Sequence, residues 1–186
     1  MTAPAIRSVG QEDLPAFFAY LDDHLADNGR HGSALFQPMA RAASRFPDDK
    51  KAAFTAGLAA PLGQPGWRRA WIAVDALGAI AGHIDLRARP EPAAAHRALL
   101  GMGVHRDWRR HGLGLRLIDA AAGWARQTRL GWIDLEVLSV NQPALSLYLR
   151  AGFHVVGEIP QMFRIDNEFL SYTLMSRALP AATPST

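Results

Sequence analysis

One short turn in this sequence combines glycines with basic side chains, and it is the segment best suited to hold a charged ligand. The turn comprises Arg109, Arg110, His111, Gly112, Leu113 and Gly114. It follows an apolar run that predicts a strand and precedes a helical pattern. Glycines let the backbone approach a ligand closely, and free N–H groups at a helix N-terminus favour an anion. We therefore expect a phosphate-bearing ligand at this turn.

The glycine spacing separates the known phosphate-binding turns. The dinucleotide motif G-x-G-x-x-G is excluded because Leu117 occupies the third position after Gly114, and no G-x-x-x-x-G-K-[ST] motif is present. What remains is R-x-x-G-x-G, formed by Arg109, Gly112 and Gly114. This pattern resembles the pyrophosphate-binding signature of the GNAT superfamily, the N-acyltransferases that use acetyl-CoA. The resemblance implies that the six residues of the turn bind this cofactor; on the motif alone, a plain basic surface loop is the alternative.

A second segment carries another pattern of the same superfamily. A strand is predicted from Trp132 to Val140. Asn141 follows it directly, and a helix is predicted from Pro143 to Ala151. The run ALSLYLRAGF at 144–153 resembles the superfamily pattern A-x-x-L-Y-x-x-x-G-F. The two signatures occur in the order and at the separation typical of the superfamily. The resemblance extends over roughly residues 70–175.

The resemblance also implies catalytic roles. Acetyl transfer from a thioester to an amine needs a neutral amine, hydrogen-bond donors for the oxyanion and a proton for the departing thiolate. Tyr148 stands at the position of the general acid; a tyrosine that only packs its ring is the alternative. Backbone N–H groups near Met102, Gly103 and Val104, freed by a kink or bulge in the central strand, would stabilise the oxyanion. Asn141 would cap the following helix, bind the cofactor, or do both.

The general base has two side-chain candidates. Glu136 lies two residues after Asp134 in a predicted strand, so the two acids share a face, and His83 shares a face with Asp85 in another strand. We rank Glu136 first and His83 second. The alternative is a chain of water molecules without a side-chain base, which the superfamily often uses.

The order of predicted elements describes a mixed α/β sheet. Strands are predicted at 5–9, 71–74, 79–86, 97–105, 132–140, 153–159 and 169–176, with 161–168 as the last connection. Helices are predicted at 48–59, 112–128 and 143–151, after a first helix that opens at 11–13 and ends at Asn28. The resemblance implies a mostly antiparallel sheet with helices on both faces and a central splayed parallel pair that holds the cofactor. We expect one domain over 1–179 and a disordered tail over 180–186.

Composition excludes several classes of function. The 186 residues contain no cysteine, which excludes disulfides, thiolate metal sites and a cysteine nucleophile. No run of apolar residues is long enough to span a membrane, no histidines and carboxylates have metal-ligand spacing, and no signal pattern opens the chain, so we expect a cytoplasmic protein without a metal. The formal net charge is only +3, and the basic cluster at the turn is expected to recruit cofactor phosphates rather than a nucleic acid.

Together these observations predict an acetyl-CoA-dependent N-acetyltransferase in which an amine attacks the thioester directly. The acceptor is expected to be a small molecule such as an amino acid or related amine; a protein N-terminus or lysine and an aminoglycoside are alternatives. A CoA-binding regulatory module without catalysis and a nucleic-acid-binding domain are the rivals from other classes. Residues 30–64, broken by prolines, are expected to close over the acceptor. Superfamily members are often dimers, so a homodimer is an open expectation.

Overall fold

The computed structural model of the chain describes residues 2–180. Its helices are α1 (Leu14–Ala26), α2 (Asp48–Ala59), α3 (Leu113–Gln127) and α4 (Gln142–Arg150). Its strands are β1 (Ala5–Ser8), β2 (Arg68–Val74), β3 (Ile80–Ala88), β4 (Arg97–Val104), β5 (Trp132–Leu138), β6 (His154–Ile165) and β7 (Glu168–Ala178). Residues 181–186 of the expected tail lie outside the described residues, and the expected domain division stays a prediction.

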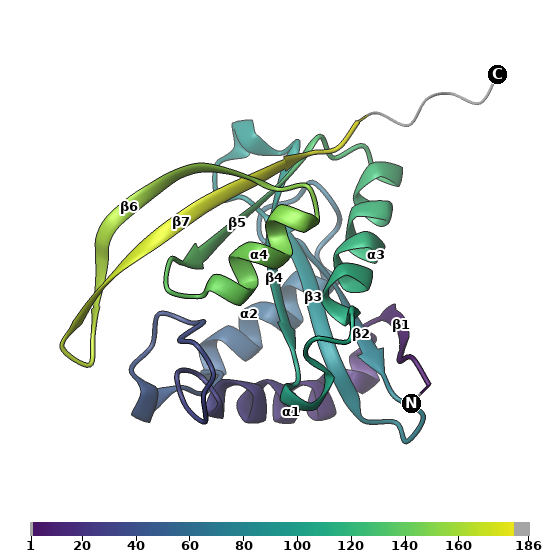
Figure 1. Ribbon diagram of the computed structural model, residues 1–186. Coiled ribbons are helices and arrows are strands. Elements are labelled where there is room, and N and C mark those ends of the chain that lie inside the picture. The colour runs from purple at the N-terminus through teal and green to yellow at the C-terminus, as the bar shows by residue number, and fades with distance from the viewer. Residues whose placement is uncertain (1, 181–186) are drawn as a thin grey trace.

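All seven strands belong to one sheet in the order β1-β2-β3-β4-β5-β7-β6 (Figure 1). Every neighbouring pair is antiparallel except β4 and β5, which run parallel. The parallel pairing covers three residue pairs, from Arg97 opposite Trp132 to Leu99 opposite Asp134, and then ends. Beyond that point the two strands diverge. The mixed, mostly antiparallel sheet with a central splayed parallel pair is therefore confirmed.

The cause of the opening differs from the one expected. β4 pairs with β3 from Ala98 opposite Ala88 to Val104 opposite Gly82 without a shift in register. Of the kink or bulge predicted in this strand, the bulge is therefore wrong, because neither Gly101 nor Gly103 shifts the pairing with β3. The opening exists because β5 leaves β4, so the edge of β4 that faces β5 loses its partner while its other edge stays fully paired.

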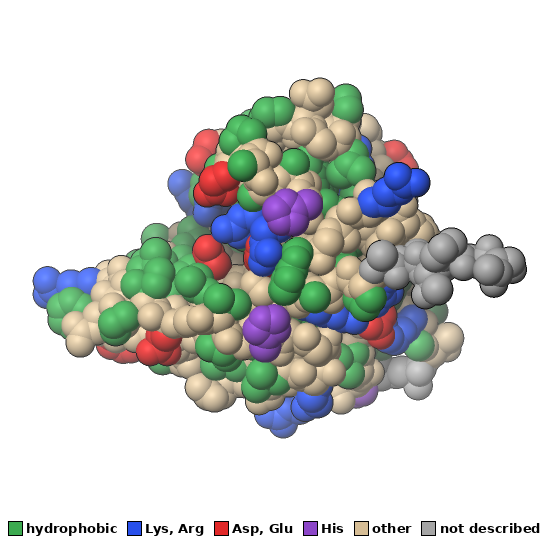
Figure 2. Space-filling model, turned by 90° about the horizontal axis from the view of Figure 1, so that it is seen from above, with side chains coloured by type: hydrophobic (Ala, Val, Ile, Leu, Met, Phe, Trp, Pro, Cys, Tyr) green, Lys and Arg blue, Asp and Glu red, His purple; other side chains and the backbone are tan. Residues whose placement is uncertain are grey.

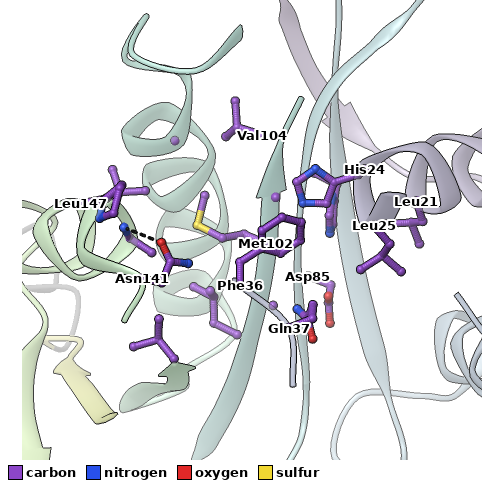
Figure 3. Close-up of a pocket in the computed structure, with 18 of the residues that line it drawn as sticks. Leu21, His24, Leu25, Phe36, Gln37, Asp85, Met102, Val104, Asn141 and Leu147 are labelled. Atoms are coloured by element: carbon purple, nitrogen blue, oxygen red, sulfur yellow. Dashed lines mark hydrogen bonds between the residues drawn. The ribbon is translucent and has the colours of Figure 1, made fainter. Parts of the chain in front are cut away.

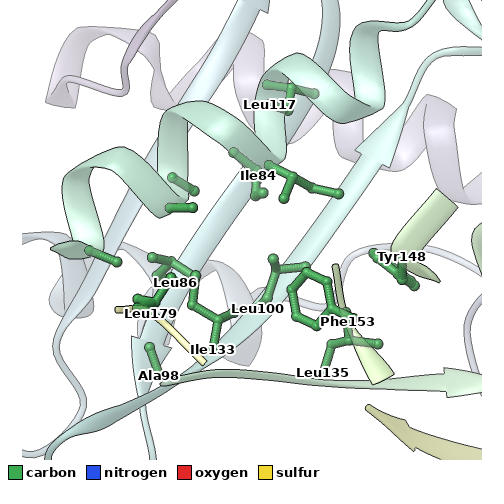
Figure 4. Close-up of a cluster of buried hydrophobic side chains, with 14 of the residues drawn as sticks. Ile84, Leu86, Ala98, Leu100, Leu117, Ile133, Leu135, Tyr148, Phe153 and Leu179 are labelled. Carbon is green, nitrogen blue, oxygen red and sulfur yellow. The ribbon is translucent and has the colours of Figure 1, made fainter. Parts of the chain in front are cut away.

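Side chains of alternating residues bury both faces of the sheet. In β2, Ala70 and Ile72 pack in one cluster with α1 and α2, whereas Ala73 belongs to a second cluster that contains α3 and α4. Figure 4 shows part of the second cluster, in which Leu117 of α3 and Tyr148 of α4 lie over the strands. Helices on both faces of the sheet are thus confirmed.

The C-terminal hairpin is longer than the sequence indicated. The segment predicted as a connection, residues 161–168, continues β6 to Ile165, and only Asp166 and Asn167 form the turn. Both turn residues have positive φ, at 49° and 67°, as the two-residue turns that match strand twist require. The strand predicted at 153–159 was thus too short, because most of β6 is solvent-exposed and lacks the alternation that marks a half-buried strand.

The hairpin exposes several large hydrophobic side chains, namely those of Val155, Val156, Ile159, Met162 and Phe169. Figure 2 shows hydrophobic atoms in green along the arm at the left. On the same face, basic and acidic side chains lie beside one another around the central hollow. The expected homodimer stays a prediction.

Candidate active site

A cavity of about 820 Å³ extends along both sides of β4. We call the part bordered by Met102, Gly112, Asn141, Leu147 and Tyr148 the α4 lobe, and the part bordered by His24, Phe36, Asp85, Gly101, Gly103 and Glu136 the α1 lobe. Figure 3 shows Asn141 and Leu147 on one side of Met102, and His24 on the other. The two lobes meet where β5 has left β4.

The edge of β4 that faces this opening presents free backbone groups. The N–H of His105 donates to the carbonyl of Ala81 at 2.9 Å, which fixes the alternation of the antiparallel pair. Gly103 therefore bonds toward β3, whereas the N–H groups of Met102 and Val104 point toward the opening. The carbonyl of Val104 accepts a hydrogen bond from Nε of Arg109 at 3.2 Å, as this orientation requires.

The N-terminus of α3 borders the same lobe. The first hydrogen bond of the helix runs from the N–H of Arg116 to the carbonyl of Gly112, and within residues 2–180 no acceptor meets the N–H groups of residues 112–115. Gly112 has φ of 75°, and a Cβ placed on it would meet no atom within 4 Å. Its backbone is thus open to a ligand, and the free N–H groups favour an anion there.

Gly114 lacks a side chain for a different reason. A Cβ at this position would lie 2.8 Å from Cδ2 of Leu147, so the glycine lets α3 and α4 approach each other. The packing of these helices brings Leu147 and Met102 together at the wall of the α4 lobe. One glycine of the motif therefore faces open space, and the other sets the spacing of two helices.

The guanidinium of Arg109 is bound within the protein. It donates to Oγ of Ser33 at 2.7 Å and pairs with the carboxylate of buried Asp27 at 2.8 Å, in addition to its bond to Val104. Arg110 and His111 are exposed and have no ion pair in the described part of the chain. The exposed positive charge beside the α3 N-terminus that has no partner within residues 2–180 thus comes from Arg110 rather than from Arg109.

Asn141 borders the α4 lobe from the turn before α4, and Tyr148 borders it from α4 itself. Oδ1 of Asn141 accepts a hydrogen bond from the N–H of Ala144 at 3.3 Å, which makes Asn141 the N-cap of the helix. Tyr148 is 8% exposed and packs edge-on against Phe153. Burial raises the pKa of its phenol well above the usual value of 10.0, so the hydroxyl stays protonated and can donate.

The two acids predicted on one face of β5 have different surroundings. Asp134 is buried and bonds to Nε of Arg97 at 2.8 Å and to the hydroxyl of Ser176 at 2.6 Å. Burial opposes its ionisation, but these hydrogen bonds prevail and hold its pKa below the usual 3.8. Glu136 is exposed and lines the α1 lobe, so it is the carboxylate of this strand that a ligand can reach.

His83 belongs to a buried aromatic group. Its Nδ1 lies 3.2 Å from the hydroxyl of Tyr20, which donates to the carbonyl of Gly103 at 3.3 Å. The rings of His24, Phe17 and Tyr20 stand edge-on to it. Burial lowers the pKa of His83 and of His24 from 6.5 to about 3, with a further contribution from their charged neighbours, so both rings are neutral at physiological pH.

Gly101 and Gly103 form the floor of the α1 lobe. A Cβ on Gly101 would lie 2.7 Å from Oδ1 of Asp85, and one on Gly103 would lie 2.4 Å from Nε2 of His24. Side chains at these positions would fill the lobe. The glycines therefore mark the close approach of other side chains to the strand rather than a bulge in it.

Sequence reasoning missed His24 and the organisation of the loop above the lobe. His24 follows Leu21 by three residues on the buried stripe of α1, and a polar residue on an apolar stripe is the signal that could have identified it. Asn28 is fully buried, accepts the N–H groups of Phe36 and Gln37, and donates to Ser44. It was interpreted only as a helix stop, whereas its amide holds the loop that covers the lobe.

Comparison with known proteins shows the family of this chain. Residues 37–153 match the acetyltransferase (GNAT) family, which is more than half of the chain. The chain belongs to this family. The L-amino acid N-acetyltransferase AaaT of Escherichia coli (strain K12) is 26% identical over 118 residues, which cover 61% of this chain and 70% of that protein.

Solved structures share the fold of this GNAT protein. The acetyltransferase of the GNAT family from Streptococcus pneumoniae has a TM-score of 0.77 at 21% identity, and the match covers 94% of this chain and 98% of that one. The phosphinothricin acetyltransferase from Sinorhizobium meliloti, in complex with AcCoA, has a TM-score of 0.77 at 18% identity, with 100% and 93% covered.

As a GNAT acetyltransferase, the protein takes its acetyl group from acetyl-CoA, and the α4 lobe fits that donor. The open backbone at Gly112 and the exposed guanidinium of Arg110 suit its phosphates. The free edge of β4 at Met102 and Val104 suits the amides of its extended arm. Within residues 2–180, no group of three potential ligands is placed to hold a metal ion, and no helix has the length and hydrophobicity needed to cross a membrane.

Proposed function

We propose that this enzyme acetylates the primary amine of a small molecule, such as an amino acid or a related amine, by direct attack on the thioester. The observation that carries the proposal is the two-lobed cavity along β4, bordered by α3 and α4 on one side of the strand and by α1 and the loop after it on the other. Bound acetyl-CoA supplies the activated acetyl group. Because the chain has no cysteine, no thiol of the protein can carry the acetyl group as an intermediate.

Tyr148 is proposed as the general acid. Its hydroxyl has no hydrogen-bond partner in the described part of the chain, the side chain borders the α4 lobe, and burial keeps the phenol protonated. A proton delivered to the departing thiolate lowers the barrier to bond cleavage. The N–H groups of Met102 and Val104 are proposed as donors to the oxygen on which negative charge develops.

Glu136 is proposed as the general base, ahead of His83. The carboxylate of Glu136 is exposed in the α1 lobe, where it can take a proton from an amine directly or through water. His83 has a pKa of about 3, and one of its ring nitrogens is held by Tyr20. A ring with so low a pKa is a poor acceptor for the proton of an ammonium group.

The acceptor is proposed to be small because the α1 lobe is covered. Leu21 and Leu25 of α1, together with Phe36 and Phe46 of the loop after it, border the lobe opposite the sheet. The relative AaaT is an L-amino acid N-acetyltransferase, which supports the same class of acceptor. A folded protein surface would have to displace this cover, and so would an aminoglycoside larger than the lobe.

The proposal is tested first by calorimetric titration of acetyl-CoA into the purified protein, with dephospho-CoA and acetate as comparisons. Binding of acetyl-CoA with micromolar affinity is expected. Thiol release is then measured with amino acids, polyamines and peptides as acceptors. Binding without thiol release for any amine would favour a regulatory CoA-binding module, and acetylation of peptides alone would contradict the small-molecule acceptor.

A further inference from the structure

Two arginine side chains in the α1 lobe lack hydrogen-bond acceptors. Arg68 of β2 and Arg87 of β3 are directly opposite in the sheet. Their Nη1 atoms lie 3.1 Å and 3.5 Å from Oδ2 of Asp85. Neither contact has hydrogen-bond geometry, and this buried oxygen has no hydrogen-bond partner in the part of the chain described. Two guanidiniums thus share one carboxylate through charge alone, and their N–H groups remain free to bind another acceptor.

The positive charge in this lobe exceeds the negative charge. Arg45 and Lys50 also line it, and neither has an ion pair within residues 2–180. The acids of the lobe are Asp85 and Glu136. Arg68 is also largely withdrawn from water: its side chain is 20% exposed, and its guanidinium lies 4.5 Å above the ring of Phe54. A desolvated cation without hydrogen bonds is costly, and a bound anion would remove that cost.

The position of Arg87 connects this charge to the reaction. Its Nη1 lies 3.2 Å from the point that a Cβ on Gly101 would occupy, so the guanidinium covers Gly101. The next residue is Met102, whose N–H faces the opening, and neighbouring residues of a strand are about 3.3 Å apart. In an α-amino acid, the amine and the carboxylate are attached to the same carbon. A carboxylate held at Arg87 would therefore place its own amine at the opening.

We propose that Arg68 and Arg87 form a carboxylate-binding site for the acceptor, with Asp85 as the residue that positions both guanidiniums. The inference rests on the proposed function and narrows its acceptor to α-amino acids. Polyamines and aminoglycosides carry several positive charges and no carboxylate, so the lobe disfavours them.

The test compares acceptors that differ only in the carboxylate. Thiol release from acetyl-CoA is measured with the standard L-amino acids and with their α-carboxamides, using the full chain and its Arg87→Gln, Arg87→Lys and Arg164→Gln variants. The wild type is expected to favour the best amino acid over its carboxamide by about 10- to 100-fold in kcat/KM, as expected when a charged hydrogen bond is lost. Arg87→Gln removes most of that preference, Arg87→Lys retains part of it, and Arg164→Gln on β6 retains all of it.

The outcomes separate this inference from the proposed function. A wild type that acetylates carboxamides as well as amino acids would overturn the carboxylate site while leaving the enzyme an N-acetyltransferase. An equal loss for both acceptors in Arg87→Gln would make Arg87 a structural residue and would also overturn it. Absence of thiol release with every amine would instead refute the proposed function.

Discussion

The two buried histidines should make the protein lose stability in mild acid. Burial lowers the pKa of His24 and of His83 from 6.5 to about 3. At pH 8, well above 6.5, both rings are neutral in the folded and the unfolded chain, and they cause no pH dependence. At lower pH, the unfolded chain binds protons that the folded chain rejects, so the free energy of unfolding falls as the pH falls toward 3.

The size of the effect follows from the shift. Each bound proton changes the free energy of unfolding by about 1.36 kcal/mol per pH unit, so at about pH 5 one ring costs about 2 kcal/mol and both about 4 kcal/mol relative to pH 8. A domain of this size has a total stability of only about 5–15 kcal/mol. Carboxylates such as Asp134, whose pKa is lowered from 3.8, titrate below about pH 5 and therefore do not contribute to the change between pH 5 and pH 8.

Urea unfolding followed by circular dichroism at several pH values between about 5 and 8 measures this slope. His24→Asn and His83→Asn should each lower the number of protons taken up on unfolding near pH 5 by about one, and so reduce the pH dependence of the unfolding free energy. This holds whatever their effect on stability at pH 8. His96→Asn is the matched control, because this imidazole is exposed. A wild-type slope that matches that of the His24→Asn variant would refute the claim that the fold holds His24 neutral.

Three further substitutions test the site and the sheet. Tyr148→Phe should lower kcat by about 100-fold or more while the calorimetric Kd for acetyl-CoA stays within about twofold, because only the proton donor is lost; unchanged kcat removes the acid role. Gly112→Asp should weaken acetyl-CoA binding by about 10- to 100-fold, because its carboxylate would repel a phosphate. Gly78→Asp, also at positive φ with open space around it, should leave the affinity unchanged. Equal affinities of the two variants for acetyl-CoA would argue against the anion site. Asp134→Ala should lower the urea-unfolding free energy by about 2–4 kcal/mol, because Arg97 loses its partner; a loss below about 0.5 kcal/mol would show that the pair is dispensable.

The turn at 109–114 and the segment after Asn141 could be identified from the sequence because the contacts on which they depend are local. The turn at 109–114 precedes a helix whose apolar spacing is evident in the sequence, and Asn141 caps the helix that begins at the next residue. Strand and helix periodicity likewise placed α2 at its observed bounds and β4 within one residue. The long β6–β7 hairpin was underestimated, because exposed strands have no periodic signal.

The sequence by itself thus determined the family and the cofactor, since the two motifs that indicate them are spacings of a few residues. Tertiary structure alone decided that Arg109 is bound to Asp27, 82 residues away, and that Gly101 makes room for Asp85 rather than for a bulge. It also decided that β5 leaves β4 after three residue pairs and so joins the two lobes. Such facts depend on which strands become neighbours and in which register, and the spacing of residues along the chain does not encode either.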